Sequence, residues 1–197
     1  MKELTEPSKP QEDAQKPAKP EKIDPKFKYE IMKMPGAEKI QMCFQCGTCT
    51  ADCAIARFTD FYKPRKIARI VQLGLKNRLL GNDALWLCTT CFTCVDHCPQ
   101  GVEVSSIVRA LRNISVKDGN AVPSVFKVFA SNILKSGYVY LMPESRTRKR
   151  EADGLPSLPK PNLEHVAKLF EATGVSKALE AAKTVEKVDV KAGSHVG

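Results

Sequence analysis

Most of this 197-residue chain lacks cysteine, because all eight of its cysteines lie between Cys43 and Cys98. Aromatic residues are also scarce, at 7%, so we expect a modest and largely aliphatic core. No stretch approaches 18 consecutive apolar residues, and the most apolar one, residues 122–142, is interrupted by Lys127 and Lys135, which argues against a membrane span. The N-terminus shows no apolar segment of a secretory signal. These absences predict a cytoplasmic protein.

The confinement of the cysteines to one segment narrows their chemistry. Cytosolic thiols are kept reduced, so a disulfide framework is disfavoured and a metal site is favoured. The formal net charge of +9 would suit nucleic acid or an acidic partner. Four thiolates on a 2+ cubane core leave about −2 per site, so two such sites would lower the total to roughly +5. We therefore expect a mildly basic protein with buried anionic centres.

Composition divides the chain into three regions. Residues 1–35 are rich in Lys, Glu, Gln and Pro, and we expect a flexible arm because such a segment buries too little apolar surface to offset its ordering entropy. Residues 36–140 contain the cysteines and form the expected domain. In residues 141–197 the basic run 146–150 is interpreted as a linker, and it precedes an amphipathic helix around 163–179 and a loose tail beyond Val185.

Apolar residues at helical spacing predict a mainly α-helical domain. One helix is expected to begin at Pro64, with its apolar face continuing to Leu79, and to stop at the Gly81-Asn82 pair. A second is expected to begin near Ser105 or Ser106, and a third to cover residues 124–135 and close at Gly137. Alternating patterns typical of strands are scarce.

The eight cysteines form two copies of the motif C-x2-C-x2-C-x3-C, displaced by 45 residues. Three cysteines on a tight loop suit three corners of a [4Fe–4S] cubane, so the fourth ligand must come from elsewhere in the chain. In two-cluster proteins with this spacing, the fourth cysteine binds the other cluster. The sequence therefore predicts two [4Fe–4S] clusters with crossed ligands. The first is assigned to Cys43, Cys46, Cys49 and Cys98, and the second to Cys88, Cys91, Cys94 and Cys53.

This assignment gives every iron a cysteine ligand, so the sequence favours electron transfer over catalysis at a cluster. A zinc-stabilised nucleic-acid-binding module is disfavoured, because zinc sites pair two C-x2-C knuckles rather than using three successive cysteines. An enzyme in its own right would need an exchangeable iron. Among the histidines, His97 lies inside a cluster loop, where it either tunes a potential or faces solvent, and His165 and His195 are expected to be solvated.

Several residues near the motifs have two interpretations each. Gly47 allows either a close approach of the backbone to sulfur or simply a turn. Phe44, Phe92 and Trp86 either shield the clusters from water or pack in the core. The basic run 146–150 either steers an acidic partner or is solvated.

The segment Cys43-Phe44-Gln45-Cys46-Gly47-Thr48-Cys49, followed by Cys53 without a proline, resembles the C subunit of heterodisulfide reductase from methanogenic archaea. The helix around residues 70–75 and the Trp86-Leu87-Cys88-Thr89-Thr90-Cys91 segment are similar to that family too. The match covers about residues 38–137 and implies an α-helical ferredoxin domain. The 34 residues between Cys53 and Cys88, with their predicted helix, agree with that fold.

The resemblance also implies a role. The C subunit would relay electrons from the flavin-bearing A subunit to the catalytic B subunit, which reduces the mixed disulfide of coenzyme M and coenzyme B in the last step of methanogenesis. The family's catalytic clusters use adjacent cysteines, whereas this chain has no adjacent pair and no cysteine after Cys98. We therefore expect a non-catalytic relay in a cytoplasmic complex of these three subunits, linked to a hydrogenase or formate dehydrogenase, with no nucleic acid bound.

The alternative is an iron–sulfur subunit of another respiratory or sulfur-metabolising oxidoreductase complex. Succinate-type subunits carry an N-terminal [2Fe–2S] domain, but no cysteine precedes Cys43 here. Glycolate-type subunits are fused to a cysteine-rich domain that this sequence lacks. A bacterial homologue of the C subunit in a sulfur pathway stays open.

Overall fold

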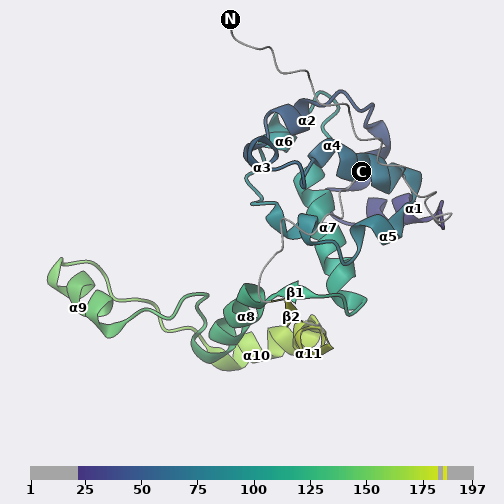
Figure 1. The fold of residues 1–197 in the computed structure, drawn as a ribbon. Coiled ribbons are helices and arrows are strands. Elements are labelled where there is room, and N and C mark those ends of the chain that lie inside the picture. Colours follow the sequence, from purple (N-terminus) through teal and green to yellow (C-terminus); the bar gives the residue numbers. More distant parts are fainter. Residues whose placement is uncertain (1–21, 182–183, 186–197) are drawn as a thin grey trace, which may run out of the picture.

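A computed structural model describes residues 22–181 and 184–185 of the chain (Figure 1). Around the cysteines, short helices pack about two longer ones, so the fold is mainly α-helical, as predicted. The elements of this part are α1 (Phe27–Met32), the 3₁₀ helix η1 (Glu38–Met42), α2 (Thr48–Ala51), α3 (Ala54–Phe58), α4 (Pro64–Leu73), α5 (Lys76–Leu79), the 3₁₀ helix η2 (Asp83–Leu87), α6 (Thr93–Asp96) and α7 (Val104–Lys117).

Helix α4 is shorter than the sequence predicted. Pro64 begins it as expected, since proline needs no hydrogen-bond partner in the first turn. Gly74 ends it in a left-handed conformation with φ at 73°, and cap N–H groups there bond the carbonyls of Ile70 and Val71. The predicted continuation to Leu79 is therefore wrong, and residues 76–79 form the separate helix α5.

Helix α7 runs through the centre of this part and contributes much of its core (Figure 1). It begins at Val104, slightly before the predicted start. Ile107, Val108 and Leu111 are fully buried, and α7 packs against α4, α1 and η2. Burying each such side chain stabilises the fold by about 1.5–3 kcal/mol. The core is mostly aliphatic, as expected.

A helix before the first motif also belongs to this core. Phe27 and Ile31, which share one face of α1, are both completely buried, and α1 contacts α4 and α7. The expectation of a flexible arm through residue 35 is therefore wrong for residues 27–32. Their apolar i, i+4 pair is a short signal within a segment rich in charge and proline. Residues 1–21 of the expected arm lie outside the described residues.

The chain then continues into a more open extension (Figure 1). Its elements are β1 (Val122–Pro123), α8 (Ser124–Ser136), α9 (Glu144–Ala152), α10 (Leu163–Ala172), α11 (Val175–Ala181) and β2 (Thr184–Val185). Helix α8 ends at Gly137, as predicted. The two short strands pair in parallel. Within the described residues, none of the helices combines the length and apolarity needed to cross a membrane.

Two details of this extension were not expected from the sequence. The basic run 146–150, interpreted as a linker, is helical and lies within α9, which stands away from the other helices and has no buried residue (Figure 1). The single helix expected over 163–179 is divided at Thr173-Gly174 into α10 and α11. The tail predicted beyond Val185 lies outside the described residues.

Candidate metal centres

Two cavities of equal size lie among the loops that carry the cysteine motifs, each enclosing about 360 Å³ with its open mouth included. The first cavity is lined by Cys43, Cys46, Cys49 and Cys98. The second cavity is lined by Cys53, Cys88, Cys91 and Cys94. All eight cysteines are free thiols. The fold therefore brings to each cavity three cysteines of one motif and the last cysteine of the other.

Left-handed backbone positions shape both loops in the same way. Gln45 (φ 65°) and Thr90 (φ 52°) precede the second cysteine of each motif, and Gly47 (φ 93°) and Phe92 (φ 63°) follow it. Such strain at a non-glycine residue is typical of functional sites, where the surrounding structure enforces it. A Cβ at Gly47 would meet nothing nearer than Arg65 Cδ, at 3.7 Å. The left-handed backbone at Gly47 is one that glycine adopts without strain, and turn geometry is therefore sufficient to explain this glycine.

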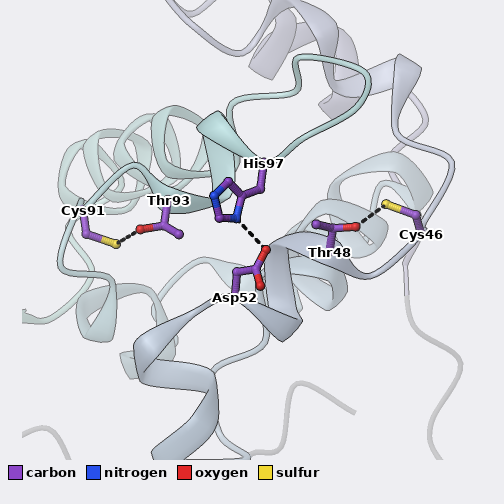
Figure 2. A network of polar contacts seen from close by, with 6 residues as sticks. All are labelled: Cys46, Thr48, Asp52, Cys91, Thr93 and His97. Atoms are coloured by element: carbon purple, nitrogen blue, oxygen red, sulfur yellow. Dashed lines mark hydrogen bonds and ion pairs between the residues drawn. The ribbon is translucent and has the colours of Figure 1, made fainter.

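Polar contacts follow the same repeat (Figure 2). The Thr48 hydroxyl lies 3.5 Å from Cys46 Sγ, and the Thr93 hydroxyl lies 3.5 Å from Cys91 Sγ. Between these pairs, His97 Nδ1 lies 2.6 Å from Asp52 Oδ2. Asp52 and His97 occupy equivalent positions in the two motifs, so this contact joins the two loops at matching places. His97 is thus partnered by a carboxylate, and the exposed pair contributes at most about 1 kcal/mol.

The segment before each motif is held by a side chain that sequence reasoning missed. On α4, Gln72 Nε2 donates hydrogen bonds to the carbonyls of Ile40 (3.2 Å) and Cys43 (2.8 Å). On α7, Arg112 donates to the carbonyls of Leu85 (2.8 Å) and Cys88 (2.6 Å). The accepting residues are 45 positions apart, while Gln72 and Arg112 are 40 positions apart. Because Gln72 and Arg112 differ in residue type, the sequence carries no signal that relates the two clamps.

The offset of 40 also relates the residues that line the cavities. Tyr62, Pro64 and Arg65 correspond in this register to Val102, Val104 and Ser105. Tyr62 and Pro64 line the second cavity, and their counterparts Val102 and Val104 line the first. Arg65 lines the first cavity, and its counterpart Ser105 lines the second. The structural repeat therefore extends beyond the cysteines into α4 and α7.

The cysteines of each motif differ in their environment. Burial raises the pKa of the Cys49 thiol to about 11, and burial also raises the pKa of Cys94. The pKa values of the exposed thiols shift the other way: hydrogen bonds from the hydroxyls of Thr48 and Thr93 lower the pKa of Cys46 and Cys91, respectively. Each motif thus presents one thiol toward the interior and one toward the surface.

The aromatic residues singled out from the sequence have separate positions. Phe44 lines the first cavity and Phe92 the second, and both side chains remain exposed, so packing in the core does not explain them. Trp86 packs against Phe126, with ring centroids 4.9 Å apart and ring planes at 46° to each other. The Arg112 guanidinium lies 5.3 Å from the Trp86 ring. Of these three aromatic residues, Phe44 and Phe92 therefore line the cavities and Trp86 does not.

The donor sets match the chemistry of an iron–sulfur cluster. Four soft thiolates surround each cavity, and sulfur atoms accept hydrogen bonds from Gln45 Nε2 to Cys43 (3.2 Å) and from the Val102 N–H to Cys98 (3.2 Å). Within the described residues, the cysteines do not converge on the position of a single metal ion. A polynuclear cluster is the group that these residues fit.

Comparison with known proteins agrees with this geometry. Residues 39–102 match the family model of a 4Fe-4S dicluster domain. The chain is 36% identical, over 80% of its length and 86% of the relative's, to the C subunit of the H(2):CoB-CoM heterodisulfide,ferredoxin reductase of Methanothermobacter thermautotrophicus. It is 36% identical, over 76% of its length and 88% of the relative's, to the C subunit of the Ferredoxin:CoB-CoM heterodisulfide reductase of Methanosarcina mazei.

A further relative is an iron-sulfur C subunit of the CoB--CoM heterodisulfide reductase of Methanocaldococcus jannaschii, which is 36% identical over 78% of this chain and 83% of its own length. These matches reach well beyond the cysteine motifs into the helical extension. The chain carries two [4Fe–4S] clusters and belongs to the family of heterodisulfide reductase C subunits.

Proposed function

We propose that this chain relays electrons through its two [4Fe–4S] clusters within a CoB–CoM heterodisulfide reductase, from a flavin-bearing A subunit to the catalytic B subunit. The observation that carries the proposal is the set of four cysteines around each cavity. Four thiolates leave no iron open to a substrate, so a cluster bound there supplies one-electron transfer alone. The names of the relatives supply the reaction in which this transfer serves.

We assign the ligands in crossed sets, with Cys98 completing the first cluster and Cys53 the second. The composition of the two cavities supports this assignment. Crossed ligands keep the two motifs side by side, and the contact between Asp52 and His97 also joins the two motifs. Because the two cavities share the motif loops, the clusters lie close enough to exchange electrons.

Serine variants test the ligand sets. If the ligands cross, Cys43→Ser and Cys98→Ser alter the same cluster signal in electron paramagnetic resonance spectra, and Cys53→Ser alters the other signal together with Cys88→Ser. Each variant should lower the iron content from the value of about eight per chain that two [4Fe–4S] clusters imply. If Cys53→Ser instead changed the signal affected by Cys43→Ser, each motif would hold its own cluster.

Anaerobic copurification followed by a reoxidation assay tests the relay. The chain should copurify with a flavoprotein and with a second protein that has adjacent-cysteine motifs. Once reduced, it should be reoxidised by the CoM–CoB heterodisulfide only when that second protein is present. Reoxidation of the isolated chain by the heterodisulfide would place a reaction centre here and contradict the relay. A different set of copurifying partners would assign the chain to another oxidoreductase complex.

We further infer a cytoplasmic complex that receives its electrons from hydrogen or formate. The name of the Methanothermobacter thermautotrophicus relative includes H(2), and that of a Methanococcus maripaludis relative, 34% identical over 70% of this chain, includes H(2)/formate. Copurification of a hydrogenase or a formate dehydrogenase with the chain checks this inference. Recovery of the complex from the membrane fraction would contradict it.

A further inference from the structure

Among the equivalent residues that line the two cavities, one pair sets a charged side chain against a neutral hydroxyl. Arg65 lines the first cavity and Ser105 lines the second, at the same place in α4 and α7. Arg65 is exposed, so water screens its charge. Ser105 is only 1% exposed. The repeat therefore places a solvated cation beside one cluster and a buried hydroxyl beside the other.

The Ser105 hydroxyl lacks a partner. Its Oγ makes no hydrogen bond within the described part of the chain, and it is buried from water. Leaving a buried hydroxyl unsatisfied costs about 1–3 kcal/mol, so such groups are usually bonded. The neighbouring Ser106 is also buried, but its hydroxyl donates to Glu103 Oε2 at 2.7 Å. Ser105 is thus the hydroxyl whose partner has to come from the cavity it lines.

The surroundings of Ser105 indicate that this partner is sulfur. Ser105 lines the same cavity as Cys53, Cys88, Cys91 and Cys94, so a cluster bound by these cysteines would bring sulfur acceptors into the cavity that the hydroxyl lines. Ser105 lies in the first turn of α7, where backbone N–H groups have no intrahelical partner.

We propose that the Ser105 hydroxyl donates a hydrogen bond to sulfur of the cluster in the second cavity and thereby raises the reduction potential of that cluster. The proposal rests on the crossed ligand sets proposed above. One-electron reduction adds negative charge to the sulfur atoms, so a donor to sulfur stabilises the reduced form more than the oxidised form. Ser105 is therefore a positioning residue, because its hydrogen bond favours the electron on the second cluster over the first.

A redox titration of Ser105→Ala, Ser106→Ala and the unmodified holoprotein, followed by electron paramagnetic resonance, tests the proposal. Alanine is well tolerated in a helix. In Ser105→Ala we expect one of the two reduction steps to shift toward the oxidised form by about tenfold in its equilibrium constant, or about 59 mV for one electron. The other step should stay in place, and Ser106→Ala should shift neither.

Three results would overturn the proposal while leaving the ligand assignment intact. These are unchanged potentials in Ser105→Ala at full iron content, an equal shift of both steps, and a shift of the same size in Ser106→Ala. If Ser105→Ala binds fewer than eight irons, the pair Ser105→Thr and Ser105→Val decides, because the two side chains are similar in size and branching and only threonine keeps the hydroxyl. A lower potential in the valine variant alone supports the hydrogen bond, and equal potentials contradict it.

Discussion

Arg112 is the polar side chain on α7 that reaches back to the loop before the second motif. Its guanidinium donates to two backbone carbonyls, those of Leu85 and Cys88, and lies over the Trp86 ring. Partial burial lowers the pKa of Arg112, yet arginine keeps its charge at any physiological pH. The guanidinium therefore fixes the start of the second motif, because it binds a carbonyl in the middle of η2 and the carbonyl of the residue that follows η2.

Replacing Arg112 separates this clamp from simple packing. Arg112→Met keeps much of the side-chain volume but leaves two carbonyls unpaired, so we expect the free energy of unfolding to fall by about 2–3 kcal/mol. Arg112→Lys keeps the charge and loses the paired geometry, so it should fall between Arg112→Met and the unmodified protein. Anaerobic denaturant unfolding measures both. Equal stability of Arg112→Met and the unmodified protein would show that the two hydrogen bonds contribute nothing.

Some residues of the metal centres could be predicted from the sequence, and others could not. The cysteines and their cluster type follow from local spacing, because a cubane requires three thiolates on one loop. Gln72 and Arg112 escaped detection because their partners lie 24–32 positions away along the chain. The sequence marks Ser105 only as a candidate helix start, since nothing local shows that its hydroxyl is buried beside a cavity.

At the scale of elements, a glycine rather than the apolar periodicity determines where helix α4 ends. The pattern from Ile67 to Leu79 fits one continuous helix, but Gly74 adopts a left-handed conformation and ends α4 there. Its carbonyl accepts a hydrogen bond from the Asp24 N–H at 2.8 Å. A Cβ at Gly74 would collide with the Asp24 carbonyl oxygen. The break thus lets the segment before α1 cross the end of α4.

Two alanine variants distinguish backbone strain from this close approach. Gly74 and Gly119 have nearly the same φ, 73° and 72°, but a Cβ at Gly119 would meet nothing within 4 Å. Gly119→Ala should therefore cost only the left-handed strain, about 1 kcal/mol. Gly74→Ala should cost about 1–3 kcal/mol more, because the crossing segment must move. Denaturant unfolding compares them, and equal losses would mean that the crossing adds no constraint.

The short helix α1 allows a second test at this scale. Phe27 is fully buried, whereas Tyr29 on the same helix is 51% exposed. Phe27→Ala should lower the free energy of unfolding by about 3–5 kcal/mol, and Tyr29→Ala should change it by no more than about 0.5 kcal/mol. Thermal and denaturant unfolding of the iron-loaded protein provide the values. A negligible effect of Phe27→Ala would restore the view of this region as a free arm.

Across the whole molecule, two related halves explain why both clusters have the same framework. The motifs repeat at an offset of 45 residues and the helices that follow them at 40, so the second half has five residues fewer between its motif and its helix. Spacing alone revealed the first offset. The second stayed hidden because its pairs, such as Gln72 with Arg112, share a place in the fold rather than a residue type. The helical fold class was predictable, and the packing of its halves was not.

The described chain also divides into regions of different local stability. Helix α7 has eight buried residues, whereas α9 has none. A nine-residue helix gains little stability without packing. In the isolated holoprotein we therefore expect the α9 amides to exchange with deuterium by local opening, far faster than the α7 amides, which should exchange only through near-global unfolding. Exchange monitored by mass spectrometry measures both, and protection of α9 equal to that of α7 would show that α9 is packed in solution.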